Sequence, residues 1–163
     1  MGKIVYHGTL SGKAPHEFDQ PYFHAGTKES ALDRLLHKSE TTTETGEYAP
    51  GSGQIHAYEV GDTAPTSSKV FGDPMDRNPV PEGNIKKIHR YVNALENEGA
   101  TSMVIPTRFV GTHVRHLGAQ FSNNLDNVLT KASQHVGASE QENKGSALKP
   151  SQKQKLSEIY SEL

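Results

Sequence analysis

A histidine, a glycine and a threonine follow one another at the end of the first apolar stretch, in the segment KIVYHGT. Because Gly8 has no Cβ, a ligand can approach the backbone closely there. His7 and Thr9 supply directional hydrogen bonds suited to a ribose hydroxyl or an amide. An aromatic residue in the next apolar segment, Tyr22 or its neighbour Phe23, offers a face on which a flat ring can stack. The alternative interpretation is a buried histidine at a tight turn with Tyr22 in the core.

The elements that position these residues follow from the spacing of apolar side chains. Alternation predicts short strands over residues 3–9, 22–26 and 54–60. Between the last two of these, Thr27 caps a predicted helix that ends near Lys38. The apolar stripe of that helix consists of Ala31, Leu32, Leu35 and Leu36.

The second half of the chain is less regular. Residues 101–106 form an apolar run that predicts a buried strand, whereas residues 85–99 and 107–121 each fit either a helix or a strand. Residues 123–137 predict a weak helix, and a polar linker follows from about Ala138. A final helix is predicted over residues 150–163, with one apolar face. That face consists of Leu156, Ile159, Tyr160 and Leu163.

Composition excludes several kinds of protein. The 163 residues carry a formal net charge of −2, which gives no reason to expect nucleic acid or an anionic membrane as the main partner. The chain contains no cysteine, which excludes a disulfide framework and a thiolate metal site. It has neither an apolar run of about 20 residues that would span a membrane nor a signal-peptide pattern. We therefore expect a soluble intracellular product.

Nine histidines raise the question of a metal site. His113 and His116 have the spacing of a ligand pair on one helix face. No second pair with a nearby carboxylate accompanies them, so the sequence does not predict a metal site. The basic segment RFVGTHVRH can contact phosphate, although three clustered charges are usually a solvated surface.

Read together, three segments resemble the ADP-ribosyltransferase superfamily, in its diphtheria-toxin-like and poly(ADP-ribose)-polymerase-like branch. They are YHGT, PYFHAGT with the following KESALDR, and TSMVIPTRFVGTHVRHLGAQF, so the resemblance covers roughly residues 3–121. The segment YVNALENEGATS is similar to domains in phage-encoded and polyvalent proteins. It matches them at Tyr91, Asn93, Glu96, Gly99 and Ser102.

The resemblance implies an α+β fold in which two small sheets enclose a cleft. It also implies NAD as substrate, with His7, Gly8 and Thr9 as NAD contacts. In the family the aromatic side chain stacks on the nicotinamide, a role that falls to Tyr22, or to Phe23 if the register differs by one residue. A glutamate near the third strand stabilises the oxocarbenium-like transition state.

The chain departs from the family at that glutamate. Ser102 occupies the aligned position, whereas Glu96 and Glu98 lie just upstream on an expected turn. Glu96 becomes the candidate for the catalytic carboxylate; the alternative interpretation is that both are solvated loop acids. A second family aromatic is also missing, because its place falls on Asp33 or Arg34.

Two functions are expected from this pattern. The first is transfer of ADP-ribose from NAD to a host macromolecule by a phage-encoded enzyme. The alternative is an inactive protein of the same fold that acts in a virion or in host interaction. The expected location is the host cytoplasm or the virion.

The expected organisation has three parts: a transferase-like domain over residues 1–123, a weak helix and polar linker over 124–149, and a docking helix over 150–163. The final helix is expected to pack on a protein partner, on a second copy of the chain or back onto the domain. Because a self-docked helix seldom needs such a linker, the pattern favours the first two.

Overall fold

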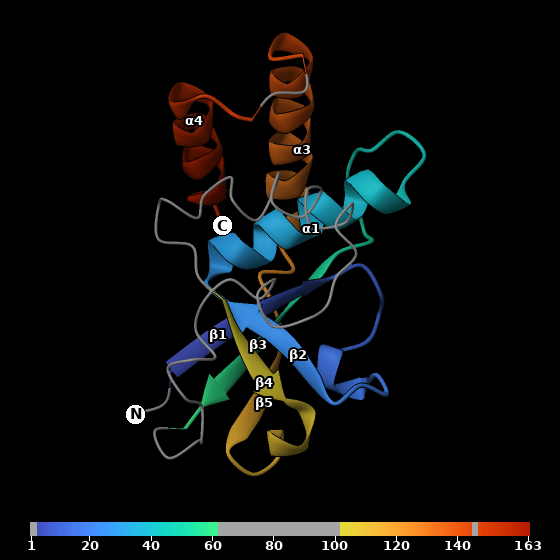
Figure 1. Cartoon of the computed structure of the whole chain (residues 1–163), viewed down its shortest axis with the longest axis vertical. Coiled ribbons are helices and arrows are strands. Elements are labelled where there is room, and N and C mark those ends of the chain that lie inside the picture. Colours follow the sequence, from blue (N-terminus) through green and yellow to red (C-terminus); the bar gives the residue numbers. More distant parts are fainter. Residues whose placement is uncertain (1–2, 62–101, 145–146) are drawn as a thin grey trace.

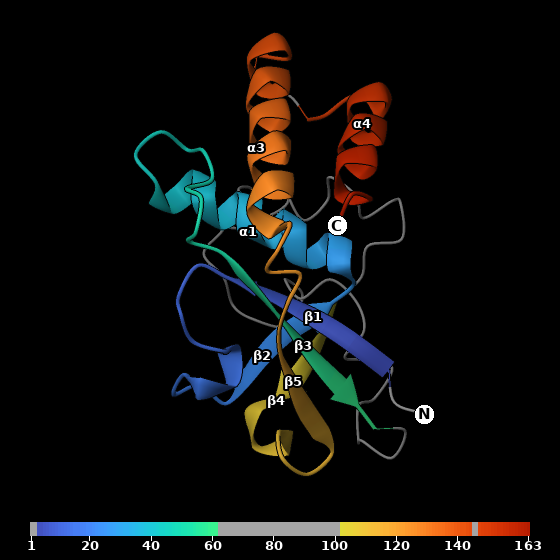
Figure 2. The same cartoon turned by 180° about the vertical axis from the view of Figure 1, so that it is seen from behind.

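The structure is a computed structural model that describes residues 3–61, 102–144 and 147–163. It belongs to the α+β class, as expected. Three helices lie together at one end of the molecule, beyond one face of a five-stranded sheet (Figures 1 and 2). In chain order the elements are β1 (Lys3–Thr9), the 3₁₀ helix η1 (Pro15–Glu17), β2 (Tyr22–Gly26), α1 (Lys28–Thr42), β3 (Gln54–Val60), β4 (Ser102–Pro106), the 3₁₀ helix η5 (Thr107–Phe109), β5 (Val114–Gln120), α3 (Leu125–Glu142) and α4 (Pro150–Tyr160).

The sheet has the order β4-β2-β1-β3-β5, and all neighbouring strands are antiparallel. β1 pairs with β3 along its whole length, from Lys3 opposite Val60 to Thr9 opposite Gln54. Between β1 and β2, however, the register contains a single pair, Tyr6 opposite Gly26. The sheet therefore consists of two parts, β4-β2 and β1-β3-β5, that are joined at one point.

Each face of the sheet carries its own apolar cluster. One cluster lies beneath the helices and combines the apolar sides of α1, α3 and α4 with Ile55 of β3. The other lies on the opposite face and includes Val5, Phe23, Tyr58, Ile105 and Val114. Ile105 and Val114 belong to the two edge strands, β4 and β5. Because they share one cluster, the sheet curves around it.

The first helix forms as its sequence indicates. The Thr27 hydroxyl accepts a hydrogen bond from the backbone N–H of Ser30, which caps the helix, and the predicted apolar stripe is buried. The helix runs four residues beyond the expected end, to Thr42. In this last turn the Ser39 and Thr42 hydroxyls donate to the carbonyls of Leu35 and Lys38, so these polar side chains satisfy their hydrogen bonds within the helix.

α3 is longer than the sequence suggested, because it includes residues that were expected to be linker. It continues to Glu142, and Ser139 in its last turns is buried. In contrast, the region of residues 107–121 that fitted either helix or strand contains the 3₁₀ helix η5 and then the strand β5. The other ambiguous region, residues 85–99, lies outside the described residues.

The apolar face of α4 is covered by the chain itself, which corrects the expectation that it binds a partner. Leu156, Ile159 and Tyr160 are 0%, 7% and 1% exposed, and Leu163 packs against the same cluster. The Tyr160 hydroxyl also donates a hydrogen bond of 2.6 Å to Asp33 of α1. α4 therefore belongs to the hydrophobic core, whereas the sequence suggested that a linker separates this helix from it. The sequence showed the stripe but not which surface covers it.

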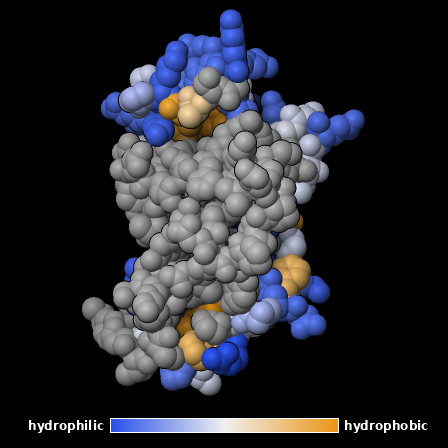
Figure 3. Space-filling model, viewed as in Figure 1, coloured by the Kyte–Doolittle hydropathy of each residue, from blue (hydrophilic) through white to orange (hydrophobic). Residues whose placement is uncertain are grey.

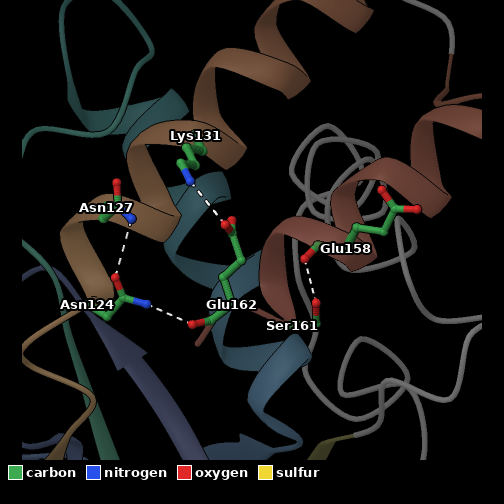
Figure 4. A network of polar contacts seen from close by, with 6 residues as sticks. All are labelled: Asn124, Asn127, Lys131, Glu158, Ser161 and Glu162. Carbon is green, nitrogen blue, oxygen red and sulfur yellow. Dashed lines mark hydrogen bonds and ion pairs between the residues drawn. The ribbon is translucent and has the colours of Figure 1, made fainter.

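Polar contacts hold the end of α4 against the start of α3 (Figure 4). The Asn124 side chain donates to the backbone carbonyl of Glu162 at 2.7 Å, and Lys131 lies 3.0 Å from the Glu162 carboxylate. The described surface at this end of the molecule is mostly hydrophilic (Figure 3). Among described residues the large hydrophobic side chains that are exposed are Ile4 and Phe18, neither of which lies on α4.

We expect Leu156→Ala to lower the free energy of unfolding by about 2–5 kcal/mol, because it removes a fully buried side chain and leaves a cavity. Urea denaturation of the monomer measures this loss. Ser157→Ala, at an exposed position of the same helix, serves as the matched control and should change stability little. A Leu156→Ala protein as stable as the control would return α4 to the role of a docking element.

Candidate functional site

His7 lies where the two parts of the sheet separate. Its imidazole Nδ1 hydrogen-bonds to the backbone carbonyl of His24 in β2. A carbonyl oxygen only accepts, so Nδ1 carries the proton and Nε2 has a free lone pair in the neutral ring. The side chain therefore spans β1 and β2 close to the one place where their backbones pair, Tyr6 opposite Gly26.

The environment of His7 keeps its ring neutral. Burial is the main cause that lowers the pKa of His7 to about 4, and the hydrogen bond to His24 acts in the opposite direction. The cations of Lys38 and Arg34, one turn apart on α1, lower the pKa further. Burial likewise lowers the pKa of His24 to about 4. At neutral pH the ring of His7 is an acceptor through Nε2 in positively charged surroundings.

Of the two aromatic candidates, Phe23 lies beside His7. The two ring centroids are 6.2 Å apart with the planes at 89°, an edge-to-face contact. Phe23 is only 2% exposed, and the centroid of its ring lies 4.9 Å from the centroid of the Tyr58 ring. Tyr22 begins β2 and its backbone pairs with Pro106, but its side chain lies outside what the structure describes.

Gly8 and Thr9 both have evident structural roles. A Cβ added to Gly8 would lie 2.5 Å from the Ala31 carbonyl oxygen and 2.7 Å from Leu35 Cγ, so this glycine allows α1 to pack closely on β1. The Thr9 hydroxyl is buried and accepts a hydrogen bond from the backbone N–H of Ser11 at 3.1 Å, which shapes the turn after the strand.

The structure describes little of the two candidate catalytic residues, Ser102 and Glu96. Ser102 begins β4, where its backbone pairs with Gly26, next to the point at which β1 meets β2. The side chain of Ser102 is not among the described ones, and Glu96 lies outside the described residues. The structure thus brings together His7, Phe23 and the backbone of Ser102 around the junction of the two sheet parts.

A second group of side chains was not recognised from the sequence. His16 of η1, His56 of β3 and His116 of β5 form a cluster on the face that carries Phe23 and Tyr58. Nδ1 of His56 lies 3.0 Å from Nε2 of His116, and the rings of His16 and His116 have centroids 4.7 Å apart. The alternation of the QIHAYEV strand, which puts His56 and Tyr58 on one face, was the available signal.

The histidine cluster is not arranged as a metal centre. Within residues 3–61, 102–144 and 147–163, no three histidine, aspartate or glutamate side chains are placed to hold one ion. The helical pair suggested for His113 and His116 does not form, because His116 belongs to β5 and His113 to the connection before it. In the same described ranges, no helix combines the length and apolar composition needed to cross a membrane.

Comparisons of the chain with protein-family models, with curated proteins and with solved structures found no match.

We expect Gly8→Ala to destabilise the protein by about 1–3 kcal/mol, the usual cost of overpacking, because the nearest obstacle to the new methyl group is the backbone oxygen of Ala31. Gly12→Ala is the matched control, since a Cβ at Gly12 has no heavy atom within 4 Å. Thermal or urea unfolding of the two variants measures the difference. Equal stabilities would show that α1 does not pack on β1 as closely as described.

The protein should lose stability as the pH falls from about 6.5 to about 4. The folded pKa of His7 is about 4, below the ordinary value of 6.5, so in this window the unfolded chain binds more protons than the folded one. Stability due to the neutral ring is fully present above pH 6.5 and decreases as the pH falls towards 4. At 1.36 kcal/mol per pKa unit, the loss from His7 alone between pH 7 and 5 is about 2 kcal/mol.

Urea unfolding at pH 7 and pH 5 tests this linkage. His7→Gln keeps a donor for the His24 carbonyl but does not titrate, so its loss between the two pH values should be smaller than that of the wild type. His113→Gln, at an exposed histidine, should behave as the wild type does. An identical pH dependence for His7→Gln and the wild type would contradict a buried neutral His7.

Proposed function

We propose that this protein binds NAD at the junction of the two sheet parts and transfers ADP-ribose to a macromolecule, with an ADP-ribosyltransferase-type fold. One observation carries the proposal: the histidine of the YHGT segment lies where β1 and β2 separate, with Phe23 beside it. A sheet that is joined at one pair and curves around an apolar cluster is compatible with the split two-sheet fold implied by the sequence resemblance.

The chemistry of the junction suits a dinucleotide. A neutral His7 that donates through Nδ1 to the protein keeps Nε2 available to accept a hydrogen bond from a ribose hydroxyl. Arg34 and Lys38 act as positive charges near His7, which favours a diphosphate in the same neighbourhood. In the reaction, the bond between nicotinamide and its ribose breaks, nicotinamide leaves, and a nucleophile of the acceptor forms the new bond to the ribose carbon.

The carboxylate for this reaction would be Glu96, because the aligned family position is occupied by Ser102. A carboxylate next to the developing oxocarbenium ion stabilises the transition state more than it stabilises bound NAD. Tyr22, as the proposed stacking residue, would contribute to binding instead. We further propose that the protein is phage-encoded and acts in the host cytoplasm or in association with the virion.

A second candidate is an inactive protein of the same fold that serves in a virion or in host interaction. Three observations favour it: Ser102 stands where the family has its glutamate, the ring of Phe23 is almost fully buried, and the Cβ side of Gly8 is filled by α1. The two candidates differ in turnover, because only the first requires release of nicotinamide.

Titration with NAD, followed by calorimetry, and an assay of nicotinamide release test both candidates. The transferase proposal predicts saturable binding that Tyr22→Ala weakens at least tenfold and that His113→Gln leaves unchanged. Absence of NAD binding in the folded wild-type protein would overturn the proposal. Binding without nicotinamide release, in the presence of host-cell extract as acceptor, would favour the second candidate.

If nicotinamide is released, Glu96→Gln should reduce the turnover rate by a factor of about 10²–10³ while the Kd for NAD changes little. This corresponds to about 2.7–4 kcal/mol, the typical loss when one stabilising group is removed from a transition state. Ser102→Ala, at the family position, is the comparison variant and should retain most of the turnover. Unchanged turnover in Glu96→Gln would remove Glu96 from the site.

A further inference from the structure

We propose that His16, His56 and His116 form an acid-sensitive latch that holds the connection between β1 and β2 on the sheet at neutral pH and releases it when the cluster binds two or more protons. This inference concerns the second group of side chains and does not depend on the proposed function. The connection, residues 10–21, contains η1, and His16 is the central residue of that 3₁₀ helix.

His16 attaches η1 to the sheet through Tyr58 of β3. Its Nδ1 lies 2.7 Å from the Tyr58 hydroxyl, and its backbone also hydrogen-bonds to that hydroxyl. Burial raises the pKa of Tyr58 well above its ordinary value, so the hydroxyl keeps its proton and donates it to Nδ1. In this contact the lone pair of Nδ1 accepts, and the His16 ring lies beside the ring of His116.

His56 and His116 are connected by a similar arrangement. Nε2 of His56 lies 3.1 Å from the amide oxygen of Gln54 and therefore carries a proton. Nδ1 of neutral His56 then accepts from Nε2 of His116 at 3.0 Å. This pair accommodates one additional proton on Nδ1 of His116, because the Nε2–H of His116 can still donate to His56. A second proton would place two N–H groups and two positive charges against each other.

The His16–Tyr58 contact and the His56–His116 contact influence each other, because the three histidine rings lie close together. The ring centroid of His116 is 4.7 Å from that of His16 and 5.2 Å from that of His56. Burial is the main cause that lowers the pKa of His56 and His116, and their positive histidine neighbours lower it further. The charged groups that face them are His16 and Glu17 of η1, and the Glu17 carboxylate partly opposes these effects.

The direction of the pH response follows from these shifts. Because the pKa values of His56 and His116 are below 6.5 when η1 is docked, the released state binds protons more readily. Falling pH below about 6.5 thus favours release. Since more than one proton is needed, release should depend on pH more steeply than a single titration does.

Hydrogen exchange measured by mass spectrometry at pH 7.0 and pH 5.0, with intrinsic rates corrected for pH, tests the latch. In the wild type, protection of residues 10–21 should fall at least tenfold at pH 5.0, and this fall should exceed the one that lower global stability causes in α3 and α4. An unchanged protection of residues 10–21, or an equal loss in α3, would overturn the proposal. This arm needs no variant.

Two variants sharpen the test. His16→Gln keeps a group that can accept from Tyr58 but cannot be protonated, so residues 10–21 should stay protected at pH 5.0 within a factor of two. His113→Gln removes an exposed histidine outside the cluster and should keep the tenfold response. A tenfold response in His16→Gln as large as that in the wild type would exclude His16 from the latch.

Discussion

The hydrogen bond from His7 to the carbonyl of His24 is the interaction around which the sheet is organised. β1 and β2 share one backbone pair, so the ladder that normally joins neighbouring strands is almost absent between them. The imidazole supplies a side-chain connection at this gap through its protonated Nδ1, while burial keeps the ring neutral at neutral pH. Because a charged ring is costly at this buried position, the stability of the folded sheet depends on pH.

The helical layer depends on a second constraint, the close contact between α1 and β1 at Gly8. With α1 fixed there, its opposite side is available to α3 and α4, and the three helices share one apolar cluster with Ile55. The buried hydrogen bond from Tyr160 to Asp33 joins the last helix to the first. The C-terminal residues consequently stabilise the same body that carries His7, although they are distant from it in sequence.

Local pattern was sufficient to predict most elements, because each leaves a period in the sequence. The strand and helix around His7, the buried strand at residues 102–106 and the final amphipathic helix are all present. The partner of that helix was not predictable, since an apolar stripe of four residues does not reveal what covers it. The end of α3 was missed because glutamate and glutamine suit both a polar linker and an exposed helix surface.

The sequence likewise predicted only part of the candidate site. His7 and its aromatic neighbour were found because they lie on adjacent strands near one short motif. The histidine cluster was missed because its members are 40 to 100 residues apart. They meet only through the strand order β4-β2-β1-β3-β5 and the docking of η1. The role of Gly8 was also ambiguous from the sequence, which suggested that its missing Cβ makes room for a ligand. In the structure that space is occupied by α1.

The tautomer of His7 shows most directly whether its ring links β1 to β2 through the His24 carbonyl. Nitrogen-15 NMR of the ring, recorded across the pH range from 7.5 to 5, distinguishes a protonated Nδ1 from a protonated Nε2. The account predicts that His7 carries its proton on Nδ1 throughout this range, with a slowly exchanging proton hydrogen-bonded to the His24 carbonyl. A ring protonated on Nε2, or one that becomes fully charged above pH 6, would contradict it.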